Sequence, residues 1–122
     1  MIGYTLLGSN HLERARAFYG AFLGAMGATA LLESPRLSLY GQALEQPMLG
    51  ICTPYDERPA QPGNGNMVAL PAGSRERVDQ LHALALALGA SDEGLPGERF
   101  QGFYMAYFRD PDGNKLAIFH KD

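Results

Sequence analysis

The stretch YFRDPDGNKL, residues 107–116, decides how the end of the chain folds. Its centre, residues 110–114, consists of Asp, Pro, Gly and Asn, which are typical of turns. The flanking segments, residues 103–109 and 115–121, have the length and the aromatic and aliphatic content of strands. The turn is superficially similar to a calcium loop, but it lacks the later bidentate Glu and lies between strands. The sequence therefore predicts a hairpin.

A helix and a strand are predicted upstream of this hairpin. Residues 67–71 are an apolar strand, Ser74 is suited to cap the following helix, and Gly89 is suited to end it. Residues 92–97 are predicted to form a loop, with pairing near residues 99–101. The helix presents an apolar stripe made of Val78, Leu81, Leu84, Ala85 and Leu88.

The first half of the chain repeats this order. Residues 2–7 are an apolar strand, and the next helix is predicted to have Asn10 as N-cap, with Glu13 completing a capping box. Gly27 ends that helix. Its apolar face is predicted to carry Leu12, Ala15, Tyr19, Phe22 and Met26, and the strands that follow are predicted at residues 29–33, 37–40 and 48–53.

The predicted order of elements, a strand, a helix and three strands, therefore occurs twice in the sequence. A shift of 63 residues places Tyr4 on Met67 and the pair Glu13-Arg14 on Glu76-Arg77. One such module is too small for a core of its own. We predict one α+β domain over residues 1–122, with modules at about 1–54 and 64–122 joined by a Pro/Gly-rich loop at about 54–65.

Composition excludes several classes of function. Hydrophobic residues make up 46% of the chain, without a span that could cross a membrane, and the net charge of −3 is spread without basic blocks. We therefore expect neither membrane insertion nor nucleic-acid binding. A single cysteine, Cys52, forms no internal disulfide, and the N-terminus lacks a basic leader. These features lead us to expect a cytoplasmic protein.

Two motifs carry a resemblance to a known family. The segment NHLERARAFY at residues 10–19 and the ending at residues 107–116, on either side of an internal duplication, resemble the glyoxalase / bleomycin resistance / dioxygenase group, the vicinal oxygen chelate superfamily. The stretch PGNG at residues 62–65 resembles a branch of this group whose activity is poorly defined. The resemblance implies paired βαβββ modules that form a half-open barrel around a pocket.

The resemblance also implies where a divalent metal ion would be held. In metal-using relatives, His or Glu side chains from four strands bind the ion. Carried over by position, the four ligand sites fall on Tyr4, Gly50, Met67 and Ala117, and none of these is a ligand for Zn, Fe or Mn. We therefore predict neither a metal nor another cofactor.

Other chemically active residues have simpler interpretations. His11, His82 and His120 show no metal-binding spacing, and structural or surface roles are favoured; His120 is the best functional candidate of the three. Cys52 is favoured as a small buried apolar residue, and the Gly-rich stretch at residues 63–65 as a turn.

Strand alternation predicts which residues line a pocket. If Phe108 and Leu116 pair across the hairpin and face the helices, Tyr107 pairs with Ala117 on the opposite face. The alternative is that these side chains fill the barrel and leave no cavity. The predicted ligand-binding set is Tyr4, Leu6, Gly50, Cys52, Met67, Ala69, Met105, Tyr107, Ala117 and Phe119.

This lining favours a protein that binds a small, partly apolar molecule without a metal. The alternative is a lyase or dioxygenase that uses a rebuilt metal site or a catalytic tyrosine, Tyr4 or Tyr107. A tyrosine has a reference pKa near 10, so such chemistry needs a nearby cation, and Arg109 is the one that the sequence suggests. A third possibility is a structural or regulatory dimer without a ligand. The resemblance itself implies a homodimer.

Overall fold

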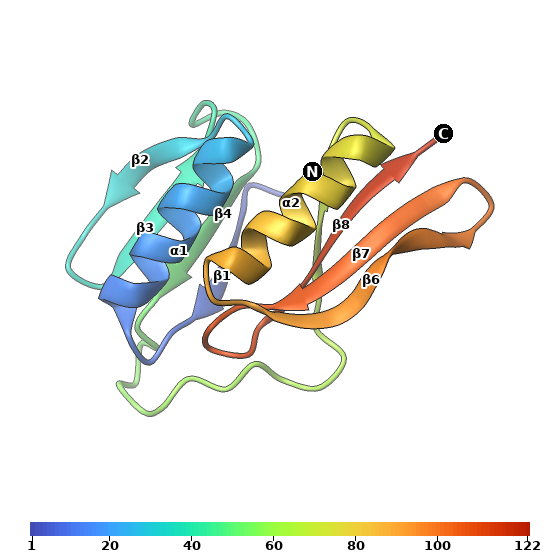
Figure 1. The fold of residues 1–122 in the computed structure, drawn as a ribbon. Coiled ribbons are helices and arrows are strands. Elements are labelled where there is room, and N and C mark those ends of the chain that lie inside the picture. Colours follow the sequence, from blue (N-terminus) through green and yellow to red (C-terminus); the bar gives the residue numbers. More distant parts are fainter. The chain divides into compact units, whose positions relative to one another are not determined.

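The computed structural model describes all 122 residues, which form two compact units, Met1–Pro62 and Gly63–Asp122 (Figure 1). Both units contain a strand, a helix and three strands in that order. This confirms the predicted α+β class with two βαβββ modules. The two four-stranded sheets are hydrogen-bonded separately, and no strand pairing joins them. Neither helix is long and apolar enough to cross a membrane.

The first unit is a four-stranded sheet with the helix α1 (Leu12–Ala25) on one face. β1 and β4 run parallel, and the other neighbouring strands run antiparallel. Residues three or four positions apart on α1 form one stripe against the sheet, and these are Ala15, Phe18, Tyr19, Phe22 and Leu23. The strands lie in the order β1 (Tyr4–Gly8), β4 (Met48–Cys52), β3 (Leu37–Gly41) and β2 (Thr29–Glu33).

The start of α1 differs from the prediction. Asn10 is not the N-cap: the helix begins after His11, whose own side chain makes no capping hydrogen bond. The Asn10 amide instead accepts from Ala60 N at 2.7 Å and donates to Ala60 O at 3.2 Å. A carboxamide has an acceptor oxygen and a donor amino group side by side, which match the backbone N–H and C=O of one extended residue. The distant partner therefore outcompeted the local cap.

The second unit repeats this architecture with α2 (Arg75–Ala87) on one face of its sheet (Figure 1). Ser74 caps α2 as predicted, with its hydroxyl accepting from Arg77 N at 3.1 Å. Gly89 follows the helix with φ 109°, a conformation that glycine adopts without strain. The strands lie in the order β5 (Val68–Pro71), β8 (Lys115–Lys121), β7 (Phe103–Arg109) and β6 (Ser91–Phe100).

The loop predicted at residues 92–97 is wrong, because these residues belong to β6. β6 pairs with β7 across three irregularities, and it is the edge strand of its sheet, where Gly and Pro are tolerated. Gly94 is needed there: a Cβ at this position would lie 2.7 Å from Cδ2 of Tyr107. The glycine therefore marks a close approach to Tyr107 and not a loop.

The predicted hairpin between β7 and β8 is confirmed, with Phe108 opposite Leu116 and Tyr107 opposite Ala117. Its turn is closed by Asp110, whose Oδ1 accepts from the backbone N of Asp112 and of Asn114, each at 2.9 Å. Oδ2 accepts from Asn114 Nδ2 at 3.0 Å. Both oxygens of this buried carboxylate are thus hydrogen-bonded within the turn, so residues 110–114 form a turn as predicted.

His82 joins α2 to the sheet. Its Nε2 lies 3.0 Å from Asp92 Oδ1 and 3.2 Å from Tyr107 O, and the residue is 4% exposed. Both partners are acceptors, so Nε2 carries the hydrogen and donates to them. This arrangement supports the structural role predicted for His82.

Candidate functional site

The predicted site residues of the second unit share one face of its sheet. Ala69 and Tyr107 flank Ala117 in register, and Met105 pairs with Phe119 in the next row. Phe108 and Leu116 alternate with them and are fully buried, on the face that α2 covers. We call the face that carries Tyr107 the open face. The exception is Met67, which precedes β5, pairs with no strand residue and is 43% exposed.

Two cations lie near the Tyr107 ring on the open face. The Arg99 guanidinium carbon is 5.4 Å from its ring centroid, and Lys115 Nζ is 5.3 Å from it. The Tyr107 hydroxyl donates to the Met105 sulfur at 3.4 Å, a weak acceptor. Cations at these distances are attracted by the face of an aromatic ring. The site therefore combines apolar side chains with two positive charges.

Arg109, the cation that the sequence suggested beside a catalytic tyrosine, is not one of the two. Arg109 donates to Glu93 Oε1 at 3.1 Å and to Gly113 O at 2.9 Å, so its charge is already paired. The alternation of side chains along a strand could have identified Lys115, because it lies two residues before Ala117 on β8 and so shares its face. Alternation could not place Arg99 on this face, because residues 92–97, the main part of its strand, were predicted to form a loop.

Aromatic rings extend the open face toward the other end of β7. Phe103 stacks on Phe100 with 4.7 Å between ring centroids, and its centroid is 6.0 Å from that of Phe119. Lys121 Nζ lies 5.6 Å from the Phe103 ring. His120 alternates with Phe119 and so points to the other face, where it lies 3.5 Å from Asp122 Oδ1. His120 therefore does not share the face of the predicted ligand-binding residues.

The predicted site residues of the first unit lie on β1 and β4. Leu6 is opposite Gly50 in register, Tyr4 is opposite Met48, and Cys52 is opposite Gly8. The Tyr4 and Leu6 side chains are 57% and 40% exposed, whereas Gly50 is buried. Burial raises the pKa of the Cys52 thiol, although nearby Arg36 opposes this shift. Cys52 is thus a neutral thiol at the end of its strand.

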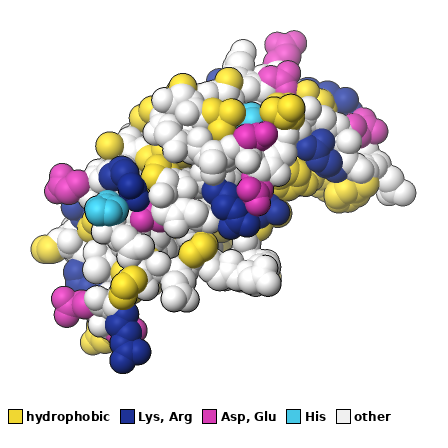
Figure 2. All heavy atoms as spheres, turned by 60° about the horizontal axis from the view of Figure 1, so that its bottom comes forward, with side chains coloured by type: hydrophobic (Ala, Val, Ile, Leu, Met, Phe, Trp, Pro, Cys, Tyr) yellow, Lys and Arg dark blue, Asp and Glu magenta, His cyan; other side chains and the backbone are white.

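On the face that Figure 2 presents, acidic and basic side chains are interspersed and do not gather into a patch of one sign. The net charge of the chain is −3.

A family comparison identifies the chain. The family model described as Glyoxalase/Bleomycin resistance protein/Dioxygenase superfamily matches residues 1–118. The chain belongs to this superfamily. The predicted resemblance is thereby confirmed. No protein of curated function matches the chain in sequence.

Solved structures agree with this superfamily assignment. A glyoxalase/bleomycin resistance protein from Albidiferax ferrireducens T118 is 34% identical with a TM-score of 0.90, and the match covers 100% of this chain and 99% of that one. A lactoylglutathione lyase from Agrobacterium tumefaciens is 25% identical with a TM-score of 0.72, over 98% and 92% of the two chains. A superfamily enzyme from Burkholderia phytofirmans PsJN, 19% identical with a TM-score of 0.81 over 98% of both chains, shares the fold.

The residues at the four metal positions that the resemblance implies do not fit a metal ion. A Cβ at Gly50 would lie 2.7 Å from Leu6 Cδ2 and 2.8 Å from Ser38 O, and closer still to Leu39 Cδ2, so the position has no room for a ligand side chain. Ala117 is fully buried between its strand neighbours. Neither Tyr4 nor Met67 supplies an imidazole or a carboxylate. No group of three His, Cys, Asp or Glu side chains is arranged to hold a metal ion.

Proposed function

We propose that this superfamily member binds a small molecule with an aromatic or aliphatic body and an anionic group, without a metal, at the open face of its second unit. The observation that carries the proposal is the position of Arg99 and Lys115 near the Tyr107 ring. The surrounding side chains, Met105 and Phe119, are apolar. Apolar walls with a few polar groups are the usual composition of a small-molecule site.

The charge of the proposed ligand follows from the partners of the basic residues. Arg75 pairs with Glu98 at 2.9 Å, and Arg109 pairs with Glu93 at 3.1 Å. Arg99 donates only to the Leu95 carbonyl, and Lys115 has no carboxylate partner. Two cations without counter-ions next to apolar rings favour an anion with an apolar body.

The experiment uses 1-naphthoate as probe and its uncharged amide, 1-naphthamide, as the matched ligand. We expect naphthoate to bind more tightly, and we expect Arg99→Gln and Lys115→Gln each to weaken it by about threefold to tenfold, as expected for loss of roughly 1 kcal/mol. Arg77→Gln, which removes the same charge from α2, serves as control and leaves binding unchanged. Calorimetry or NMR titration provides the measurement.

Three outcomes overturn the proposal. Equal affinity for naphthoate and naphthamide removes the charge argument, and absence of binding by either removes the site and favours a structural or regulatory dimer. Binding that EDTA abolishes and a divalent metal restores contradicts the metal-independent part.

A second candidate function is a lyase or dioxygenase reaction with Tyr107 as acid or base. The Tyr107 hydroxyl donates only to the weakly accepting Met105 sulfur, so it is available to a substrate, and one similar structure is described as a lactoylglutathione lyase. Turnover of a hemithioacetal or a catechol that is lost in Tyr107→Phe, while naphthoate still binds, would favour this alternative over simple binding.

The proposal also includes a homodimer in the cytoplasm, as the sequence analysis expects. Light scattering of the purified protein measures its mass, and a value of one chain, 13.2 kDa, contradicts the dimer. Cell fractionation tests the location.

A further inference from the structure

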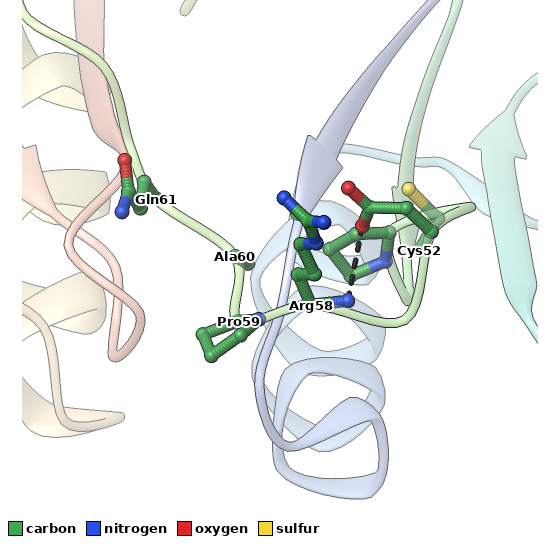
Figure 3. Close-up of a pocket in the computed structure, with 8 residues that line it drawn as sticks. Cys52, Arg58, Pro59, Ala60 and Gln61 are labelled. Carbon is green, nitrogen blue, oxygen red and sulfur yellow. Dashed lines mark hydrogen bonds between the residues drawn. The ribbon is translucent and has the colours of Figure 1, made fainter.

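The first unit contains a hollow that the proposed function does not use. It has a volume of about 570 Å³ and lies where β1 and β4 end, under the segment of residues 54–61 (Figure 3). Gly8 and Cys52, the last residues of these two parallel strands, form part of its lining. Pro54, Pro59 and Ala60 add apolar surface. This volume is sufficient for a small organic molecule.

The segment over the hollow is held in place at several points. The Asn10 amide makes two hydrogen bonds with the peptide groups of Ala60, and a Cβ at Gly8 would lie 3.0 Å from Ala60 Cβ. Glu57 N donates to Pro54 O at 2.9 Å and closes a turn. The wall is therefore preformed, which lowers the entropic cost of binding a ligand against it.

Two opposite charges line the hollow. Arg58 and Asp56 are two residues apart, and the backbone N–H of Arg58 donates to Asp56 Oδ1 at 3.0 Å, the dashed line in Figure 3. The Arg58 guanidinium and the Asp56 carboxylate form no ion pair with each other or with another residue. Each charge is thus available to a ligand.

We propose that this hollow binds a small zwitterion of the α-amino acid type with an apolar side chain. The ligand carboxylate pairs with the planar guanidinium of Arg58, and the ligand ammonium group donates to Asp56. The apolar side chain lies against Pro54, Pro59 and Ala60. A plain anion is repelled by Asp56 and a plain cation by Arg58, so the adjacent opposite charges select a molecule that carries both.

Cys52 provides the reporter for the test, because it is the only cysteine of the chain and lines the hollow. The rate of its modification by dithiodipyridine, an uncharged thiol reagent, is measured at one mildly acidic pH, at which the amino groups of L-phenylalanine and phenylalaninamide are protonated. The three probes are L-phenylalanine, phenylalaninamide, which lacks the carboxylate, and N-acetylphenylalanine, which lacks the ammonium group. We expect L-phenylalanine to slow the reaction with saturation, and each analogue to bind at least about threefold more weakly.

Variants assign the two charges. Arg58→Gln and Asp56→Asn remove one charge each, and Asn retains the oxygen that accepts from the backbone of residue 58. Both are expected to weaken the binding of L-phenylalanine by about threefold or more. For each variant, binding is measured as the slowing of Cys52 modification relative to the same variant without ligand. Glu57→Gln is the matched control, since this exposed residue belongs to the same segment but does not line the hollow.

The proposal is overturned if L-phenylalanine gives no protection, or if all three probes protect the wild-type thiol equally. It is also overturned if the two charge variants behave like Glu57→Gln. The comparison of probes on the wild-type chain needs no variant, so a misfolded variant does not weaken the test. Naphthoate binding at the second unit is measured separately, so failure of one proposal is distinguishable from failure of the other.

Discussion

Substitution of Gly50 by Ala tests whether this position, to which the resemblance assigns a metal ligand, has room for a side chain. The added methyl group would meet Leu6 Cδ2 at 2.7 Å, Ser38 O at 2.8 Å and Leu39 Cδ2 at a shorter distance. The leucine methyl groups can turn away, whereas Ser38 belongs to β3 and pairs with Ile51 of β4. Relief of the contact with Ser38 O therefore requires β3 and β4 to move apart.

The expected cost follows from overpacking in a buried site, which typically destabilises by about 1–3 kcal/mol. Because one of the three contacts is with backbone, we expect Gly50→Ala to lie in the upper half of that range. Urea unfolding followed by far-UV circular dichroism measures it, and the midpoint is expected to fall by about 1 M for an m-value of roughly 2 kcal/mol/M.

The control is Gly20→Ala, because Gly20 is an exposed residue of α1 and a Cβ there meets no atom within 4 Å. Replacing a helix-interior glycine by alanine is expected to stabilise by about 0.5–1 kcal/mol. The two glycine substitutions therefore have opposite signs. If Gly50→Ala has the wild-type midpoint, the position does accept a side chain, and the steric part of the argument against a ligand there is refuted.

Three further predictions concern the second unit. His82→Ala is expected to destabilise by about 2–4 kcal/mol because it removes buried hydrogen bonds and leaves a void, while exposed Gln80→Ala changes the unfolding midpoint little. Ser74→Ala removes the helix cap and is expected to cost about 1 kcal/mol in the same urea assay. Hydrogen bonding to Arg75 lowers the pKa of Asp122 below its usual 3.8. The wild type is therefore expected to be more stable than Asp122→Asn above about pH 3.8, and to lose this advantage as the pH falls through the lowered pKa. An advantage that persists under strong acid contradicts this.

The order of elements was predictable because it depends on local patterns. Ser74 and the turn at residues 110–114 place their signals within a few residues of the structure that they specify. The face of β7 and β8 followed from alternation once the turn fixed the register. These features need no knowledge of distant contacts.

Two local signals were misleading because distant groups determined the outcome. Asn10 has the residue type of an N-cap, yet it binds Ala60, fifty residues away. Gly94 and Gly97 are typical of a loop, yet Gly94 makes room for the Tyr107 ring within a paired strand. The error at β6 also hid Arg99, one of the two cations at the candidate site, and the other, Lys115, was not predicted either.

The lining of the two candidate sites differs in charge, and this difference gives a joint test. The open face of the second unit has two unpaired cations near Tyr107, which favour an anion. The hollow of the first unit has one cation and one anion, which favour a zwitterion. We therefore expect Lys115→Gln to weaken naphthoate binding without changing the protection of Cys52 by L-phenylalanine, and Asp56→Asn to do the reverse. If either substitution changed both measurements equally, the two ligands would not be occupying separate sites, and the assignment of one charge pattern to each unit would be wrong.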